Sequence, residues 1–253
     1  MRPMNACVDS EDAASTEAPL PVLYRDEHLI AVHKPSGLLV HRTGIDRHET
    51  RFALQMVREQ CGRFVYPVHR LDKGTSGVLL FAFASDIAHV LGVGFETGAV
   101  RKRYLAVVRG HPLAAGIVDH ALARIRDDYA GGRPDAPPQE AVTRYRRLMA
   151  WELPCQVDRY ATSRYALLEL EPLTGRRHQL RRHLKHIAHP IIGDATYGKG
   201  RHNRLFQALF GSSRLLLACT EMACAHPVTG LPLCIQAPLA DGFGAVLAGL
   251  DRA

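Results

Sequence analysis

The chain has 253 residues, of which 47% are hydrophobic and 23% charged, a composition typical of a folded globular protein and not of a disordered or fibrous one. Lys and Arg number 32 against 25 Asp and Glu, so the formal net charge is +7. No stretch approaches the roughly 18 apolar residues of a membrane span, and no signal peptide opens the chain, which together predict a cytoplasmic protein.

The first 20 residues are acidic and aperiodic, and they predict a disordered leader. Residues 21–253 then form the folded part, as a single domain, and they hold 31 basic against 21 acidic residues, a formal charge of +10. Such an excess suits a polyanion such as nucleic acid, although many soluble proteins are mildly basic as well.

The first half of the folded part alternates short apolar runs with turn residues and one amphipathic stretch. It predicts a strand at 28–33, a turn at 34–37 and an apolar piece at 38–40, then a helix at 52–60, strands at 64–70 and 78–84, and a helix that Ser85 caps and that runs to about Phe95. The strand at 78–84 is almost entirely apolar, which indicates burial on both faces.

The second half predicts a strand at 103–109, a turn-rich surface loop at 131–138, strands at 141–149 and 164–171, a helix after Gly175, and strands at 215–225 and 231–237. Strands outnumber helices and do not alternate regularly with them. This pattern favours an α+β fold with a mostly antiparallel sheet over a doubly wound one.

The first of three chemically dense stretches is residues 68–77, where a predicted strand delivers Asp72 to a loop of Gly, Thr and Ser. Catalytic groups are commonly held on loops that rigid strands anchor. A tight turn in which Asp72 and Thr75 bond local backbone amides is the alternative interpretation.

The second stretch begins with the cations Arg101, Lys102 and Arg103, which lead directly into a strand that starts at Tyr104. A tyrosine at the end of a strand can stack on a base or move a proton. It can equally be an ordinary core aromatic.

The third stretch, residues 174–204, holds eight Lys and Arg and a single acid, Asp194. Leu180, Leu184 and Ile187 share one helix face, while Arg177, Arg181 and Lys185 follow another. Like charges this close weaken a helix, so the pattern indicates either that anions bind there or that a carboxylate neutralises one arginine.

The histidines of this stretch, at positions 178, 183, 186 and 189, lack a neighbouring Glu or Cys and stand among cations, so we expect no metal site. The six cysteines show no CxxC spacing, which argues against zinc. No glycine pattern fits a dinucleotide site either, so no cofactor is expected. A metal-dependent hydrolase built on the histidines and Asp72 stays as an alternative.

Taken in order, these stretches resemble the pseudouridine synthases of the RluA family. Residues 69–72 with 75–77 are similar to the family's catalytic motif, residues 102–104 to its tyrosine motif, and residues 175–181 with 189–194 to its arginine motif and the segment after it. Residues 32–41 are similar to the family's first strand–turn–strand. The resemblance implies a pseudouridine synthase fold, with a mostly antiparallel mixed sheet, flanking helices and a central active-site cleft.

The resemblance also implies an isomerase that flips a uridine out of its stack and rejoins its base to the ribose through carbon instead of nitrogen. By this likeness Asp72 is the catalytic aspartate, Arg181 its counter-charge, and Tyr104 the residue that stacks near the uracil and handles its C5 proton. Arg70 fills the space that the flipped base leaves. The residues expected to bind substrate or RNA are His69, Arg70, Thr75, Arg101, Lys102, Arg176, Arg177, His178, Gln179, Leu180 and Lys185.

Within the family the likeness is strongest to members that modify uridine 65 of tRNA. We therefore expect a monomer with a tRNA partner, no membrane contact, no nucleotide cofactor and no metal. The same chemistry on a ribosomal RNA uridine, or RNA binding without catalysis, is the alternative.

Overall fold

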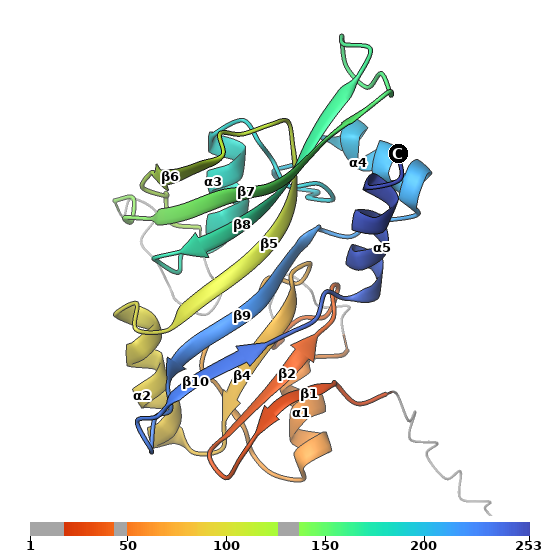
Figure 1. Ribbon diagram of the computed structural model, residues 1–253. Helices are drawn as coiled ribbons and strands as arrows, with labels where there is room; N and C mark the ends of the chain where they lie inside the picture. Colours follow the sequence, from red (N-terminus) through yellow and green to blue (C-terminus); the bar gives the residue numbers. More distant parts are fainter. Residues whose placement is uncertain (1–17, 43–49, 126–136) are drawn as a thin grey trace, which may run out of the picture.

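The structure is a computed structural model that describes residues 18–42, 50–125 and 137–253, and its strands form one mixed sheet (Figure 1). The strands are β1 (Val22–Arg25), β2 (Leu29–Lys34), β3 (Tyr66–Pro67), β4 (Ser76–Ala82), β5 (Arg101–Arg109), β6 (Ala115–Asp119), β7 (Val142–Leu153), β8 (Ser163–Pro172), β9 (Leu217–Ala225) and β10 (Pro232–Gln236). The helices are α1 (Ala53–Cys61), α2 (Ser85–Glu96), α3 (Gln179–His186), α4 (Gly200–Phe210) and α5 (Asp241–Leu250).

The sheet runs in the order β1-β2-β4-β9-β5-β8-β7-β6, with β3 added to β4 and β10 added to β9. Only β4 and β9 pair in parallel among the described strands, so the predicted α+β class with a mostly antiparallel sheet is confirmed. In Figure 1 β9 runs through the middle of the sheet, between the half that begins the chain and the half formed by β5 to β8.

The core follows the apolar runs of the sequence. Every residue of β4 is buried, as its unbroken apolar character predicts, and Leu180 and Leu184 bury one face of α3. Leu20, at the end of the predicted leader, is only 4% exposed and packs into this core. Residues 1–17, the main part of that leader, and most of the loop predicted at 131–138 lie outside the described residues.

Several predicted boundaries are wrong. The strand predicted at 64–70 is reduced to the two residues of β3, because Pro67 cannot donate to a ladder and the chain then leaves the sheet until Ser76. Ser85 is the first residue of α2 and not its cap, since Ala84 takes the N-cap position without a side-chain bond.

Four elements were not predicted at all: β1, β6, α4 and α5. β6 is an edge strand that buries only Val118 of its five residues, so its sequence carries little alternation. The helix α5 contains three glycines, which disfavour helices, and it is stabilised instead by the burial of Phe243, Val246 and Leu250.

Gly77 pairs with Cys219 where β4 runs parallel to β9. Its φ is +110°, and a Cβ atom there would lie 2.0 Å from the carbonyl oxygen of Cys219. Only glycine fits this contact, so the Thr75-Ser76-Gly77 segment sets the spacing of the two central strands directly below the loop that carries Asp72. No helix in the described ranges is long and apolar enough to cross a membrane.

Candidate active site

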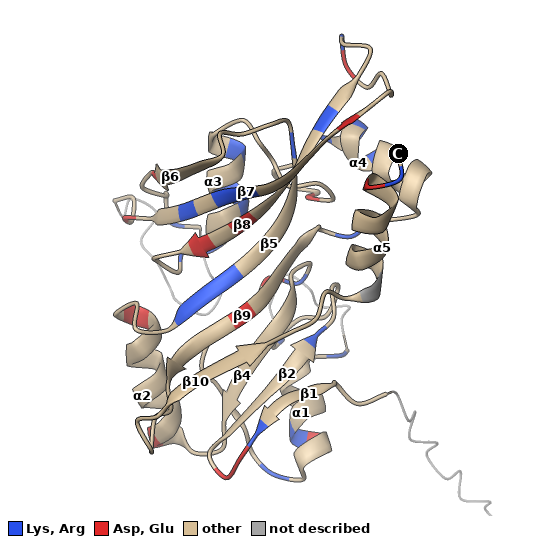
Figure 2. Ribbon diagram, viewed as in Figure 1, with Lys and Arg blue, Asp and Glu red and all other residues tan. Residues whose placement is uncertain are grey.

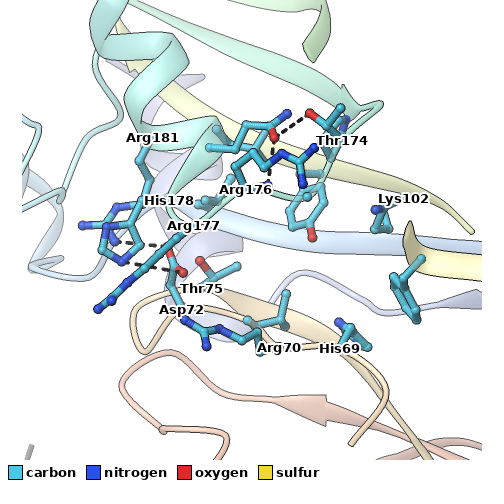
Figure 3. A pocket seen from close by; sticks show the side chains of 18 of the residues that line it. His69, Arg70, Asp72, Thr75, Lys102, Thr174, Arg176, Arg177, His178 and Arg181 are labelled. Carbon is cyan, nitrogen blue, oxygen red and sulfur yellow. Dashed lines mark hydrogen bonds and ion pairs between the residues drawn. The ribbon is translucent and has the colours of Figure 1, made fainter. Parts of the chain in front are cut away.

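A cavity of about 460 Å³ opens where three segments meet: the β3–β4 loop, the start of β5, and the chain from the end of β8 into α3 (Figure 3). All of the site residues predicted from the sequence line it except Arg101 and Lys185. In Figure 3 Arg177, His178 and Arg181 gather around Asp72 at one end, while His69 and Lys102 lie at the other.

Asp72 lies within the β3–β4 loop, in a turn that the Thr75 backbone amide closes by donating to the Asp72 carbonyl at 3.0 Å. The predicted turn is therefore present, yet the Asp72 carboxylate contacts side chains of another segment of the chain. Its Oδ2 accepts a hydrogen bond from Nη1 of Arg181 at 3.1 Å, and its Oδ1 lies 3.9 Å from Nε2 of His178. About a quarter of the Asp72 side chain remains exposed to the cavity.

Arg181 is shared between two carboxylates. Its Nε and Nη2 donate to the two oxygens of Asp194 at 2.7 and 2.9 Å, a bidentate pair, which leaves Nη1 for Asp72. The Asp194 side chain is fully buried and also accepts the backbone amides of Thr196 and Tyr197, both at 2.9 Å. Asp194 therefore fixes the direction in which Arg181 points.

The charges of this trio explain why so basic a helix is stable. Burial disfavours the cation of Arg181, but the bonds and charges of Asp194 and Asp72 outweigh burial and raise the pKa of Arg181. Burial likewise opposes the charge of Asp194, and Arg181 together with the two amides lowers its pKa on balance. Of the two explanations that the sequence left open, a neutralising carboxylate applies to Arg181.

Asp194 is a residue that the sequence analysis did not include in the site. The available signal was its position as the single acid among eight basic residues in 174–204.

Tyr104 lies in the cavity opposite Cys219, its neighbour across the β5–β9 ladder, and is 9% exposed. Burial, and then the thiol of Cys219, raise the pKa of Tyr104 well above 10. The side chain is thus a neutral phenol at physiological pH. It presents to the cavity a ring on which a base can stack and a hydroxyl that can exchange protons.

His69 and Lys102 line the cavity but are also held by protein groups. The Nε2 of His69 accepts the Leu80 amide at 3.0 Å and its ring stacks on Phe95, so the ring is neutral; burial lowers the pKa of His69 to about 3. The ammonium of Lys102 lies 5.4 Å from the ring of Phe95, and burial lowers its pKa. His69 therefore braces the loop before Asp72, whereas Lys102 lines the end of the cavity away from Asp72.

Gln179 and Leu180 line the cavity from the first turn of α3 while being buried. The Gln179 amide group donates to the Val142 carbonyl and the Thr143 hydroxyl, and its oxygen accepts from Thr174 and from the Arg176 amide. These bonds tie the segment before α3 to β7. Gln179 thus shapes the cavity wall through four protein contacts.

The remaining predicted cations form the outer surface of the site. Arg176 donates to the Glu140 carbonyl at 3.0 Å, and Arg177 lines the cavity mouth. The stripe predicted for Arg177, Arg181 and Lys185 is wrong at its first member, because α3 begins only at Gln179. Arg101 and Lys185 are exposed and lie outside the cavity, Lys185 with its ammonium 5.6 Å from the ring of Tyr197.

The histidines do not form a metal centre within the described part of the chain. His183 is buried between the Thr143 hydroxyl and the carbonyl of His120, His186 stacks on the ring of His120, and His189 bonds a carbonyl of β5. Each of these three therefore holds α3 or its end against the sheet instead of sharing a ligand with the others.

Lys34 is a second residue that the sequence analysis did not place in the site. It is fully buried, and its ammonium donates to the carbonyls of Pro35, Leu38 and Lys73 at 3.0, 2.6 and 3.1 Å. Burial lowers the pKa of Lys34 to about 7, an effect that the nearby Asp72 charge partly offsets. Lys34 thereby joins the turn after β2 to the residue that follows Asp72.

Comparison with known proteins gives one consistent result. Residues 28–186 match the family described as RNA pseudouridylate synthase. The chain is 50% identical over 222 residues to "tRNA pseudouridine synthase C" of Yersinia pestis, covering 86% of each protein. It is 46% identical over 232 residues to the protein of that name in Vibrio cholerae, covering 90% of this chain and 94% of the relative.

Solved structures agree with these relatives. The human protein "RNA Pseudouridylate Synthase Domain Containing 4" aligns with a TM-score of 0.67 and 28% identity, over 91% of this chain and 93% of its own. The human protein "RNA Pseudouridylate Synthase Domain Containing 1" aligns with a TM-score of 0.67 and 26% identity, over 90% of this chain and 87% of its own. The predicted fold is therefore confirmed.

Proposed function

The chain belongs to the RNA pseudouridylate synthase family, and on that basis we propose that it converts a uridine of tRNA, uridine 65, to pseudouridine. The relatives reported above carry tRNA in their name, and their identity of 46 to 50% extends over most of the chain. The observation that carries the proposal is the ionised Asp72 in an open cavity, paired with an arginine that Asp194 holds in place.

The reaction breaks the bond between N1 of uracil and C1′ of ribose, turns the base, and joins C5 to C1′. The C5 proton leaves and N1 gains one, so the overall change is an isomerisation that needs no redox partner or group donor. The carboxylate of Asp72 either attacks the substrate covalently or removes a ribose proton to give a glycal. Both routes use the carboxylate of Asp72, which Arg181 holds by a hydrogen bond at 3.1 Å.

Tyr104 supplies the stacking face for the turning base and a hydroxyl for the proton that leaves C5. Its ring and Asp72 line the same cavity, which has room for one nucleobase. Because the phenol is neutral, the Tyr104 oxygen accepts the C5 proton only while the hydroxyl gives up the proton that it already carries.

The target uridine has to leave its stack before it reaches this cavity, at a cost of a few kcal/mol. We propose that Arg70 fills the vacated space, which its exposure beside Asp72 on the same loop supports (Figure 3). Arg176, Arg177, Lys185 and Arg101 then contact phosphates around the cavity mouth, which adds affinity without reading sequence.

We further propose that residues 21–253 act as one catalytic domain and that the protein works as a monomer in the cytoplasm. In Figure 2 basic residues of β7 stand beside acidic residues of β8, as in the pairs Arg146–Glu169 and Arg144–Glu171. These cations have carboxylate partners, which supports RNA binding by the cations around the cavity.

Mapping pseudouridine in RNA from cells that lack the gene tests this proposal. Carbodiimide modification followed by reverse transcription reports every site, and we expect the stop at tRNA position 65 to vanish and to return with the wild-type gene. If a stop in ribosomal RNA vanished instead, the proposed reaction would hold but its substrate would be ribosomal RNA and not tRNA. An unchanged map would contradict the proposed activity.

A further inference from the structure

His178 stands between Tyr197 and Asp72. Its Nδ1 lies 3.0 Å from the Tyr197 hydroxyl, and its Nε2 lies 3.9 Å from Oδ1 of Asp72. The rings of His178 and Tyr197 meet edge to face, with centroids 5.7 Å apart at 72°. The imidazole is therefore oriented by one partner and aimed at the other.

The backbone shows that this placement is built in. His178 has φ +56°, a left-handed conformation that side chains other than glycine adopt rarely, and it forms the N-cap of α3 without a side-chain cap bond. The ring is thus turned away from the helix end, where an N-cap residue usually bonds, and toward the carboxylate. Strain of this kind is concentrated at functional sites.

The charge of Asp72 decides which nitrogen of His178 carries the proton. If the Tyr197 hydroxyl donates to Nδ1, then Nε2 carries the hydrogen and presents it to Oδ1. The other tautomer would direct a lone pair at the same carboxylate, which is repulsive. The tautomer protonated on Nε2 is therefore favoured, and Tyr197 is the group that supports it.

The two oxygens of Asp72 are consequently unequal. Oδ2 is bonded to Arg181 at 3.1 Å, whereas the Nε2–H of His178 faces Oδ1 from 3.9 Å, beyond hydrogen-bond distance. We propose that Tyr197, acting through His178, is a positioning residue that keeps Oδ1 of Asp72 oriented and unbonded, and that Oδ1 is the oxygen that reacts with the substrate. This inference rests on the proposed function.

Other charged groups also face His178. Burial lowers its pKa, the negative charge of Asp72 opposes that shift, Arg181 and Arg177 add to it, and Asp194 opposes it more weakly. The ring is therefore neutral at pH 7. Below its pKa the ring becomes a cation that would draw in Oδ1, so activity should fall on the acid side as His178 protonates.

Tyr197→Phe tests the inference because it removes only the hydroxyl and keeps the ring that packs near Arg181 at 5.0 Å. Tyr160→Phe is the matched control. Like Tyr197, Tyr160 makes a side-chain hydrogen bond through its hydroxyl, here with Arg159 at 2.6 Å, and its ring lies under an arginine, at 4.7 Å. Unlike Tyr197, it is 60% exposed and lies outside the active-site cavity. His178→Asn identifies which ¹⁵N NMR signals belong to the His178 ring, because they are missing from its spectrum. Asparagine also tolerates the left-handed backbone conformation at this position.

Two measurements are made on each protein: the single-turnover rate of pseudouridine formation on a tRNA transcript from pH 5 to 8, and the ¹⁵N shifts of the histidine rings. We expect the Nε2–H tautomer of His178 in the wild type and its loss in Tyr197→Phe. The rate of Tyr197→Phe should fall about fivefold at pH 7, as loss of one hydrogen bond implies. The fall in its rate at low pH should begin at a higher pH, because the neutral form of His178 loses the hydroxyl that donates to it and therefore protonates more readily. His178→Asn should lack this acid limb of the pH–rate profile.

Three results would overturn the inference. They are a wild-type tautomer protonated on Nδ1, a Tyr197→Phe protein identical to the control in rate and tautomer, or a slower Tyr197→Phe with an unmoved acid limb, which a purely structural role would give. Should the wild-type protein form no pseudouridine in tRNA, the proposed function fails, while the tautomer comparison still decides whether Tyr197 orients His178.

Discussion

The carboxylate of Asp194 accepts two hydrogen bonds from Arg181, at 2.7 Å from Nε and 2.9 Å from Nη2, and the Asp194 side chain is fully buried. The one remaining terminal nitrogen of the guanidinium points at Asp72. The orientation of the arginine that pairs with Asp72 is thus set by a residue that does not line the cavity.

Asp194→Asn should be costly both to stability and to activity. It leaves the guanidinium of Arg181 with one carboxylate and places an amide N–H against its donors, so we expect unfolding in urea to lose about 3 kcal/mol, as for other broken buried pairs. Glu169→Gln is the control, because it breaks the surface pair with Arg146 and should cost less than about 1 kcal/mol. Equal losses in the two variants would show that Asp194 is not a special support.

The dependence of stability on pH should carry the signature of His69. Its folded pKa of about 3 is below its ordinary value of 6.5, so its contribution is present above pH 6.5 and is lost as the pH falls toward 3. His69→Gln retains an acceptor for the Leu80 amide but does not titrate. The wild-type free energy of unfolding should therefore fall faster than that of the variant, by at most about 1.4 kcal/mol per pH unit; parallel curves would contradict this.

RNA affinity should depend on salt through the cations outside the cavity. Lys185→Gln removes one exposed cation with no carboxylate partner in the described structure, so the slope of log Kd against log salt should decrease by roughly one unit at most. Arg146→Gln removes a cation that Glu169 already neutralises and should leave the slope unchanged. A larger change for Arg146 than for Lys185 would place the RNA on a different face.

Tyr104→Phe separates stacking from proton transfer. The ring is kept, so tRNA affinity should change less than about twofold, whereas loss of a proton-handling group typically slows a reaction by about 10² or more. Deuterium at C5 of the target uridine should then reveal a larger isotope effect in the variant, measured in single turnover. If Tyr104→Phe reacts at the wild-type rate, the hydroxyl has no part in moving the C5 proton.

Much of this site could be read from local sequence, and the exceptions have physical reasons. Asp72, Tyr104 and Arg181 stand in dense, ordered motifs, and the apolar character of β4 and α3 was enough to predict the strand after Asp72 and the helix that carries Arg181. Asp194 was left out although it is the single acid among eight basic residues, because nothing local to position 194 shows that its side chain meets Arg181, 13 residues earlier.

The contribution of Lys34 was equally hidden. A lysine in a turn predicts a solvent-facing group, yet Lys34 is buried and bonds the carbonyl of Lys73, next to Asp72. His69 was expected to bind substrate or RNA, and nothing in its local sequence showed that its ring also accepts the Leu80 amide. The helix α5 was missed for the opposite reason, since its glycines argue against a helix that only burial of its apolar side chains makes stable.

The proposed site assigns the chemistry to the carboxylate of Asp72 and the binding of RNA to other groups. Single-turnover pseudouridine formation on a tRNA transcript by Asp72→Asn, with the Kd of the same transcript measured in parallel, separates the two roles. We expect no detectable pseudouridine at position 65 and a Kd within about threefold of the wild type, because the phosphate contacts remain. Wild-type formation of pseudouridine by Asp72→Asn would contradict this assignment.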